Sequence, residues 1–290
     1  MIAIASVNRL AAKLAKPNSQ SWNQQPAKFA VDMSFGDSDV LSIVIPARNA
    51  EQYIVQCLLS INESTLACPG LRVEVVVGID DCENTKASIR AFENVPLMFD
   101  LRVFESKAHC GTYVMLNSII RKTIGRWIAT VGADDMVRTS WLSDLVRPVR
   151  SDETVVAVNT LFETVDAGGN HVGYSTIPPH GCWCYRRDYL FNALGAFYYP
   201  WQRGADEEMY IRSHFGWRAV EAVVPVPSYR YRRHSRQITD YSNSGIVRKG
   251  REDTWRRAFI DAEKARYSDG EIPFIPNNAP TTYLTQVKMK

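Results

Sequence analysis

Residues 41–49 read Leu-Ser-Ile-Val-Ile-Pro-Ala-Arg-Asn, an apolar run that stops at a proline and passes directly into polar residues. A short run of aliphatic and β-branched residues that ends at a breaker is typical of a strand buried on both faces of a parallel sheet. Apolar residues then recur at the spacing of one helix face: Ile54, Cys57, Leu58 and Ile61. The stretch therefore predicts a buried strand followed by a helix that packs on it.

The same strand-then-helix pattern is repeated further along the first half of the chain. Buried strands are predicted at 73–77, 101–104 and 127–131, and helices at 87–92, at 111–125 and, after Ser140 as N-cap, from Trp141 to Val149. Repeated alternation of this kind indicates an α/β fold, with one mostly parallel sheet flanked by helices.

The second half of the chain has a different composition and a less regular pattern of predicted elements. After a short strand at 155–158, glycine, proline and aromatic residues become denser from 167 to 201, as expected where loops shape a substrate pocket. Helices are predicted at 207–215 and 252–266. We therefore expect three parts, namely an extension at 1–36, an α/β domain at 37–240 with halves at 37–150 and 151–240, and a C-terminal helix and tail at 241–290.

Composition limits the class of protein. The 290 residues are 46% hydrophobic and 22% charged, which is ordinary for a soluble globular chain, and a net charge of +3 does not by itself indicate a polyanionic partner. No apolar run reaches the roughly 18 residues of a membrane span. Six cysteines without a Cys-x-x-Cys pair predict reduced thiols. We expect a cytoplasmic protein, with an amphipathic helix over 1–16 that lies on a membrane as the alternative.

Polar pairs follow three of the predicted strands. They are Arg48-Asn49, Asp80-Asp81 and Asp134-Asp135. In a doubly wound sheet, ligands bind beyond the carboxyl ends of the strands. Asp and Asn are also common in turns and caps, so a single pair has a structural explanation. Three pairs at equivalent ends favour a ligand site.

Asp134 and Asp135 suggest the chemistry of this site. Adjacent carboxylates supply the hard oxygen ligands that Mg²⁺ or Mn²⁺ prefers, and such an ion bridges to a diphosphate. It would offset the negative charge that builds on a departing nucleoside diphosphate. The acidic pair therefore predicts a divalent metal site for phosphate-linked substrates.

These segments, in this order and spacing, resemble a family 2 glycosyltransferase of the GT-A fold over about residues 40–240. Residues 41–49 with Tyr53-Ile54 resemble the strand that holds the nucleotide base, and 74–81 resemble the second strand with its paired aspartates. Gly111 and Asn117 keep a Gly-x5-Asn spacing, and 128–135 match the acidic metal motif. The resemblance implies a nucleotide-sugar donor, with UDP favoured, bound by Pro46, Arg48, Asn49, Asp81, Gly111, Asn117, Asp134 and Arg233.

Two departures from the family pattern affect the donor side. Gly132 stands where many relatives carry the first carboxylate, so the metal is expected to rely on Asp135, with Asp134 facing the sugar or ribose. Leu116 replaces a common arginine, so one donor contact is expected to be missing. Tyr231-Arg-Arg-His234 resembles a loop that closes over the diphosphate, which implies that His234 binds the metal or a phosphate oxygen. A solvated histidine in a basic loop is the alternative.

The acceptor side follows from a second resemblance. Ala205-Asp206-Glu207-Glu208 resembles the family's Glu-Asp helix start, with Ala205 in place of the glutamate and Arg212 keeping the register. Asp206 is therefore expected to be the general base in an inverting displacement. A helix-start carboxylate stabilised by the macrodipole is the structural alternative, and Glu207 or Glu208 are alternative bases. Trp183, Glu207 and Glu208 are expected on the acceptor side.

Other function classes remain as alternatives. A non-catalytic nucleotide-sugar-binding module would keep the fold without turnover. A nucleotidyltransferase is less favoured, because 47–51 contain no glycine to form a phosphate-gripping loop. The acceptor is a glycan or another hydroxyl compound. Arginines and a lysine between 230 and 257 also allow a nucleic-acid base, or a lipid-linked glycan at a membrane, as acceptor. The sequence does not indicate an oligomeric state.

Overall fold

The computed structural model describes residues 39–196, 198–200, 204–235, 237, 251–271, 273 and 279–289. The extension predicted at 1–36 lies outside the described residues, and so does the start of the predicted C-terminal part, 241–250.

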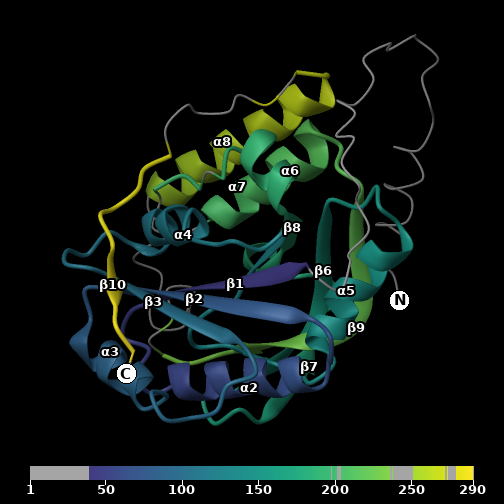
Figure 1. Ribbon diagram of the computed structural model, residues 1–290. Helices are drawn as coiled ribbons and strands as arrows, with labels where there is room; N and C mark the ends of the chain where they lie inside the picture. Colours follow the sequence, from purple (N-terminus) through teal and green to yellow (C-terminus); the bar gives the residue numbers. More distant parts are fainter. Residues whose placement is uncertain are drawn as a thin grey trace. The chain divides into compact units, whose positions relative to one another are not determined.

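A ten-stranded sheet runs through the described residues (Figure 1). Its nucleus is parallel and consists, in spatial order, of β3 (Asp100–Ser106), β2 (Arg72–Asp80), β1 (Val40–Ala47) and β4 (Trp127–Thr130). The chain first adds strands on one side of β1 and then moves to the other side. The carboxyl ends of β1 and β4 therefore meet at a switch point, where a doubly wound sheet binds its ligands.

The remaining strands extend this nucleus on both sides. β10 (Thr285–Val287) pairs antiparallel with β3. Beyond β4 the order is β8 (Cys184–Arg186), β6 (Ala157–Val165), β9 (Glu221–Arg232) and β5 (Met136–Val137), and β7 (His171–Tyr174) pairs with β6. β8 is antiparallel to both neighbours, whereas β6 and β9 are parallel. The predicted α/β fold is confirmed, with a sheet that is mixed at its flanks.

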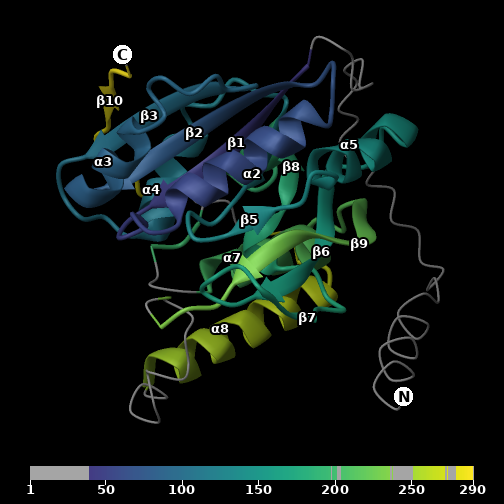
Figure 2. The same ribbon diagram turned by 90° about the horizontal axis from the view of Figure 1, so that it is seen from below.

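Helices cover both faces of the sheet (Figures 1 and 2). Ile43 and Ile45 pack in one core with α2 (Ile54–Leu66) and α5 (Trp141–Ser151), whereas Val44 belongs to a second core on the opposite face. This second core includes α4 (Thr112–Ile120), α6 (Arg187–Asn192) and α7 (Ala205–Ile211). Since alternate side chains of a strand point to opposite faces, an unbroken apolar strand is what a sheet covered twice requires.

Two further helices complete the described fold. α3 (Glu83–Arg90) follows β2, four residues earlier than predicted. α8 (Arg251–Ser268) confirms the predicted C-terminal helix, and its Ile260 and Tyr267 pack with Ile211 at the end of α7. The helix predicted over 207–215 ends at Ile211 and continues as a π-helical turn, η2 (Arg212–Gly216).

One helix end differs from the prediction, and one predicted N-cap makes no side-chain hydrogen bond. α4 ends at Ile120, five residues before Gly125. Gly125 is required instead by close approach to β1, because a Cβ there would lie 2.3 Å from the Ser42 Oγ atom. Ser140 precedes α5 but does not cap it with its side chain, and its carbonyl accepts the Asp144 N–H as in an ordinary helical turn.

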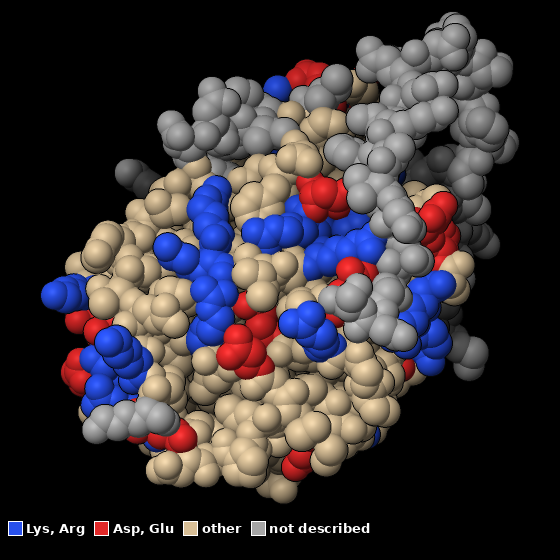
Figure 3. All heavy atoms as spheres, in the orientation of Figure 1, with Lys and Arg blue, Asp and Glu red and all other residues tan. Residues whose placement is uncertain are grey.

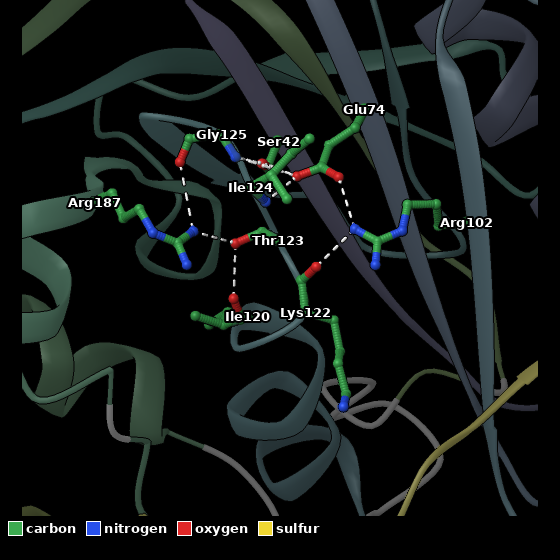
Figure 4. Close-up of polar contacts among 9 residues, drawn as sticks. All are labelled: Ser42, Glu74, Arg102, Ile120, Lys122, Thr123, Ile124, Gly125 and Arg187. Atoms are coloured by element: carbon green, nitrogen blue, oxygen red, sulfur yellow. Dashed lines mark hydrogen bonds and ion pairs between the residues drawn. The ribbon is translucent and has the colours of Figure 1, made fainter.

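A buried carboxylate joins the amino ends of the strands (Figure 4). Glu74 of β2 is 1% exposed and accepts hydrogen bonds from the Ser42 hydroxyl of β1 and from the N–H groups of Ile124 and Gly125. Arg102 of β3 donates to its other oxygen over 3.1 Å. Glu74 thus ties three strands to the loop before β4, on the edge of the sheet opposite the switch point.

Two other expectations concern the described chain as a whole. Among the described helices, none combines the length and apolar character that crossing a bilayer demands. The six cysteines carry free thiols, as their spacing predicted.

Candidate active site

The ends of β1 and β2 present the first group of predicted donor residues. Arg48, Asn49 and Asp81 are exposed, and Pro46 is half-buried. Asn49 and Asp81 have φ angles of 51° and 47°, in the left-handed region that Asn and Asp tolerate better than most residues. Both turns therefore direct polar side chains outward at the carboxyl edge of the sheet.

Asp80 has a supporting role next to Asp81. Its buried carboxylate accepts the N–H groups of Cys110 at 2.7 Å and Gly111 at 3.0 Å, and it lies 2.7 Å from the Nδ1 atom of His109. Burial alone would raise the pKa of Asp80, but these hydrogen bonds outweigh burial and hold the pKa below its usual value. Asp80 thereby fixes Gly111, which has a φ of 86° and begins α4.

The acidic pair after β4 divides into an inner and an outer carboxylate. Asp135 is 4% exposed and accepts the Tyr229 hydroxyl at 2.6 Å and the Arg232 N–H at 2.8 Å. Burial, and then repulsion by Asp134, raise the pKa of Asp135. The Asp134 side chain is 32% exposed, and its Oδ2 atom lies 2.9 Å from the Nε2 atom of His234. Asp134 is therefore the more exposed carboxylate of the pair and Asp135 the buried one, whereas the sequence expectation assigns the metal to Asp135.

The segment after β9 is held against the start of α2. Arg232 is buried and donates from Nε to the Asp134 carbonyl and from Nη2 to the Gln56 side chain, both at 2.7 Å. Its guanidinium lies 4.8 Å from the centre of the Tyr53 ring, and the His234 ring lies 4.6 Å from the same ring. These contacts fix His234 beside Asp134. Arg233, the predicted phosphate contact, is exposed next to them.

The Asp134 and His234 side chains offer an oxygen and a nitrogen ligand to a divalent ion. Within the described ranges, no group of three or more His, Cys, Asp or Glu side chains is arranged to hold a metal alone. Mg²⁺ is commonly bound by one or two protein carboxylates together with substrate phosphates and water, and carboxylate ligands also suit Mn²⁺. The donor set therefore fits an ion whose coordination a diphosphate completes.

The predicted base lies on the first turn of α7. Asp206 is half-buried, and its Oδ1 atom accepts the Tyr113 hydroxyl of α4 at 2.7 Å. The buried Cys182 thiol connects this region with the acidic pair, because its pKa is raised by burial first and then by the negative charges of Asp135, Asp206 and Asp134. Asp206 and the acidic pair thus both act electrostatically on the Cys182 thiol.

Two predicted residues lie in the core. Asn117 is fully buried, and its amide donates to the Tyr198 carbonyl and accepts the Tyr198 N–H, each at 2.8 Å. Trp183 is 2% exposed and stacks on Tyr185 and Tyr210. Both side chains support the site from behind in this structure, and neither presents an open surface to a substrate.

The two glutamates that follow Asp206 have different surroundings. Glu208 is buried and pairs with Arg212 through two hydrogen bonds of 3.0 and 2.7 Å. Glu207 is 22% exposed along its side chain and pairs with Arg257 of α8 at 2.8 Å. Glu208 therefore belongs to the packing of α7, and Glu207 to the contact between α7 and α8.

Three tyrosines that contact site residues were not among the predicted site residues, although Tyr53 lies in the segment that resembles the base-binding strand. Tyr113 contacts Asp206, Tyr229 contacts Asp135, and Tyr53 contacts both Arg232 and His234. Tyr113 lies in the helix predicted over 111–125, where only Gly111 and Asn117 were expected at the site. The signal available in sequence is that a buried tyrosine hydroxyl needs a hydrogen-bond partner.

The basic residues of 230–257 are partly accounted for by protein contacts. Arg230 donates to Glu163 and to the Gly169 carbonyl, Arg232 is buried, and Arg257 pairs with Glu207. Elsewhere, Lys and Arg side chains gather beside α4 on the face shown in Figure 3. Arg230, Arg232 and Arg257 thus have partners within the protein, and a nucleic-acid acceptor stays a prediction.

The sheet order and the helices that cover it define the GT-A fold, which solved structures share. The chain belongs to glycosyl transferase family 2, whose model matches residues 42–211.

Curated relatives agree with the family assignment. The chain is 25% identical over 143 residues to the glycosyltransferase GlyG of Streptococcus pneumoniae serotype 4, a match that covers 48% of this chain and 44% of GlyG. It is 24% identical over 127 residues to an uncharacterised glycosyltransferase of Haemophilus influenzae, covering 43% of this chain and 38% of the relative. The chain thus spans less than half the length of these relatives.

Solved structures share the fold. S. aureus TarS 1–349 in complex with UDP-GlcNAc has a TM-score of 0.61 and 17% identity, with 78% of this chain and 69% of that chain covered. The mannosyltransferase PcManGT from Pyrobaculum calidifontis, in complex with GDP-Man and Mn²⁺, has a TM-score of 0.58 and 18% identity, with 93% and 73% covered.

Proposed function

We propose that the chain is a divalent-metal-dependent, inverting glycosyltransferase that moves a sugar from a nucleoside-diphosphate sugar to an acceptor hydroxyl. The observation that carries the metal dependence is the pair formed by Asp134 and His234, with 2.9 Å between oxygen and nitrogen at the carboxyl end of β4. PcManGT, which shares the fold, was solved with Mn²⁺ and GDP-Man. We assign Mn²⁺ or Mg²⁺ to this pair.

The donor would lie along the carboxyl edge of the sheet. Asp81 and Cys82 line a small pocket at the ends of β2 and β3, and its wall includes Lys86 and Glu105, which form an ion pair of 2.6 Å. We assign the nucleotide base and ribose to this region and favour UDP, because the Asp81 carboxylate is able to accept the imide N–H of uracil. TarS, which has this fold, was solved with UDP-GlcNAc.

In the proposed reaction, Asp206 takes the proton from the acceptor hydroxyl while the oxygen of that hydroxyl bonds to the anomeric carbon. The bond between that carbon and the diphosphate breaks, and its electron pair leaves with the nucleoside diphosphate. When bound, a divalent ion would offset the negative charge of the departing nucleoside diphosphate. We assign a phosphate contact to Arg233, which is exposed next to His234. A single base opposite the leaving group implies direct displacement with inversion.

The first experiment is thermal unfolding with UDP, GDP, UDP-GlcNAc and GDP-mannose, each with and without Mn²⁺. At a ligand concentration near 100 times Kd the stabilisation is about 2.7 kcal/mol, which moves the midpoint by several degrees. A shift that requires both metal and one nucleotide supports the proposal and identifies the base. No shift with any pair would count against donor binding.

Two matched variants test the metal ligand. Asp134→Asn is expected to abolish the Mn²⁺-dependent part of the shift, because it removes the exposed carboxylate beside His234. Asp135→Asn is expected to retain a metal-dependent shift, because that carboxylate faces Tyr229 and the Arg232 N–H. If instead Asp135→Asn lost the metal-dependent shift and Asp134→Asn kept it, Asp135 would be the metal ligand.

A further inference from the structure

The two carboxylate oxygens of Asp206 have different surroundings. Oδ1 accepts the Tyr113 hydroxyl at 2.7 Å, and the same hydroxyl accepts the Gly204 N–H at 3.0 Å. Oδ2 faces Gly181, where an added Cβ would lie 3.2 Å away. One oxygen is therefore held by the protein, and the other borders a position that carries no side chain.

We propose that Tyr113 is a positioning residue for Asp206, which fixes the carboxylate through Oδ1 and leaves Oδ2 to receive the proton of the acceptor hydroxyl. This inference rests on the proposed function of Asp206 as the base. The proton passes to Oδ2, the hydroxyl oxygen bonds to the anomeric carbon, and the carbon–diphosphate bond breaks toward the leaving group. Gly181 keeps the approach to Oδ2 open.

Tyr113 is suited to be a permanent donor. Burial, and then the negative charge of Asp206, raise the pKa of its phenol well above the ordinary value. The hydroxyl therefore keeps its proton at neutral pH and points it at the carboxylate. The other titratable groups that interact with Asp206, Tyr198 and Cys182, also have pKa values raised chiefly by burial. All three stay neutral, so none of them competes as a base.

The Tyr113 ring is fixed from behind. It stacks on Tyr198 with 5.8 Å between ring centres, and Asn117 holds the Tyr198 backbone through two hydrogen bonds. The Gly204 N–H fixes the phenol oxygen from the start of α7. A catalytic group held by packed neighbours reacts from one geometry, and small misplacements reduce turnover strongly. This gives Asn117 a structural part in the site.

The test uses the full chain and slow hydrolysis of UDP-GlcNAc or GDP-mannose, whichever the thermal screen selects, with water as the acceptor. Tyr113→Phe is expected to lower kcat by about 10-fold or more while the KM for the donor stays unchanged. A loss of kcat without a change in KM indicates a positioning role, because the Asp206 carboxylate is then misplaced for proton transfer while donor binding is intact.

Tyr198→Phe is the matched control, since it also removes a buried hydroxyl beside Asp206 but leaves the hydrogen bond to Oδ1 intact. Its kcat should stay near the wild-type value, and a loss equal to that of Tyr113→Phe would overturn the inference. Gly181→Ala tests the other oxygen and should reduce kcat without changing the KM for the donor. Wild-type kcat in Gly181→Ala would contradict the assignment of Oδ2.

Asp206→Asn separates this inference from the proposed function. Full hydrolysis in Asp206→Asn would show that Asp206 is not the base, and the proposed mechanism would fall with that assignment. An inactive Asp206→Asn together with wild-type kcat in Tyr113→Phe would overturn only the positioning role. Donor-dependent thermal shifts in each variant check that the fold and the donor site are retained.

Discussion

At the scale of single residues, hydrogen-bond partners separate neighbours that look equivalent in sequence. Asp80 and Asp81 are adjacent, yet one carboxylate is buried under the segment 109–111 and the other is exposed. Asp134 and Asp135 divide in the same way. The sequence predicts that such pairs end strands, but which member faces inward depends on partners far along the chain, such as Tyr229.

Asp80→Asn is expected to lower the unfolding free energy at pH 7 by about 2 kcal/mol, because one acceptor is replaced by a donor that faces the N–H groups of 110 and 111. The pKa of Asp80 is depressed in the folded protein, so its contribution is present above the unfolded pKa and disappears as pH falls. Urea unfolding should therefore show the difference from wild type narrowing below about pH 4. Asp81→Asn, at the exposed neighbour, is the control and should change little at either pH.

At the scale of elements, buried strands and amphipathic helices were predictable, because both follow from local apolar patterns. The ends of helices were less predictable from the sequence. Gly125 looks like a helix terminator but is needed for contact with β1, and α7 passes into a π-helical turn that no local pattern indicates. The partner of Glu208 was not predictable either, since its pairing with the buried Arg212 is seen only in the folded helix.

The buried pair of Glu208 and Arg212 yields a prediction for α7. Glu208→Gln leaves a buried guanidinium without its counter-charge, so the unfolding free energy should fall by about 3–5 kcal/mol. Glu207→Gln, on the exposed side of the same turn, should cost less than about 1 kcal/mol. Urea midpoints at constant m-value measure both. Similar losses in the two variants would contradict the assignment of Glu208 to the packing.

At the scale of the whole described fold, the two edges of the sheet have separate tasks. The carboxyl edge carries Asp81, Asp134 and His234, whereas the amino edge is tied by Glu74 and its four donors. The sequence predicted the first edge because ligands of such sheets bind there. It gave no sign of the second, because Ser42, Glu74 and Arg102 come together only through the register of three strands.

Glu74→Gln should therefore change stability without changing the donor site. Replacing the carboxylate by an amide removes the ion pair with Arg102 and sets an N–H group against its guanidinium, which costs about 2 kcal/mol and lowers Tm by several degrees. The additional Tm shift produced by Mn²⁺ and the selected nucleotide should equal that of wild type. Asp134→Asn should show the opposite pattern, with Tm near wild type and no metal-dependent shift. If Glu74→Gln also lost the nucleotide shift, the two edges would be coupled through the strands, and stability and donor binding would have to be treated as one property of the sheet.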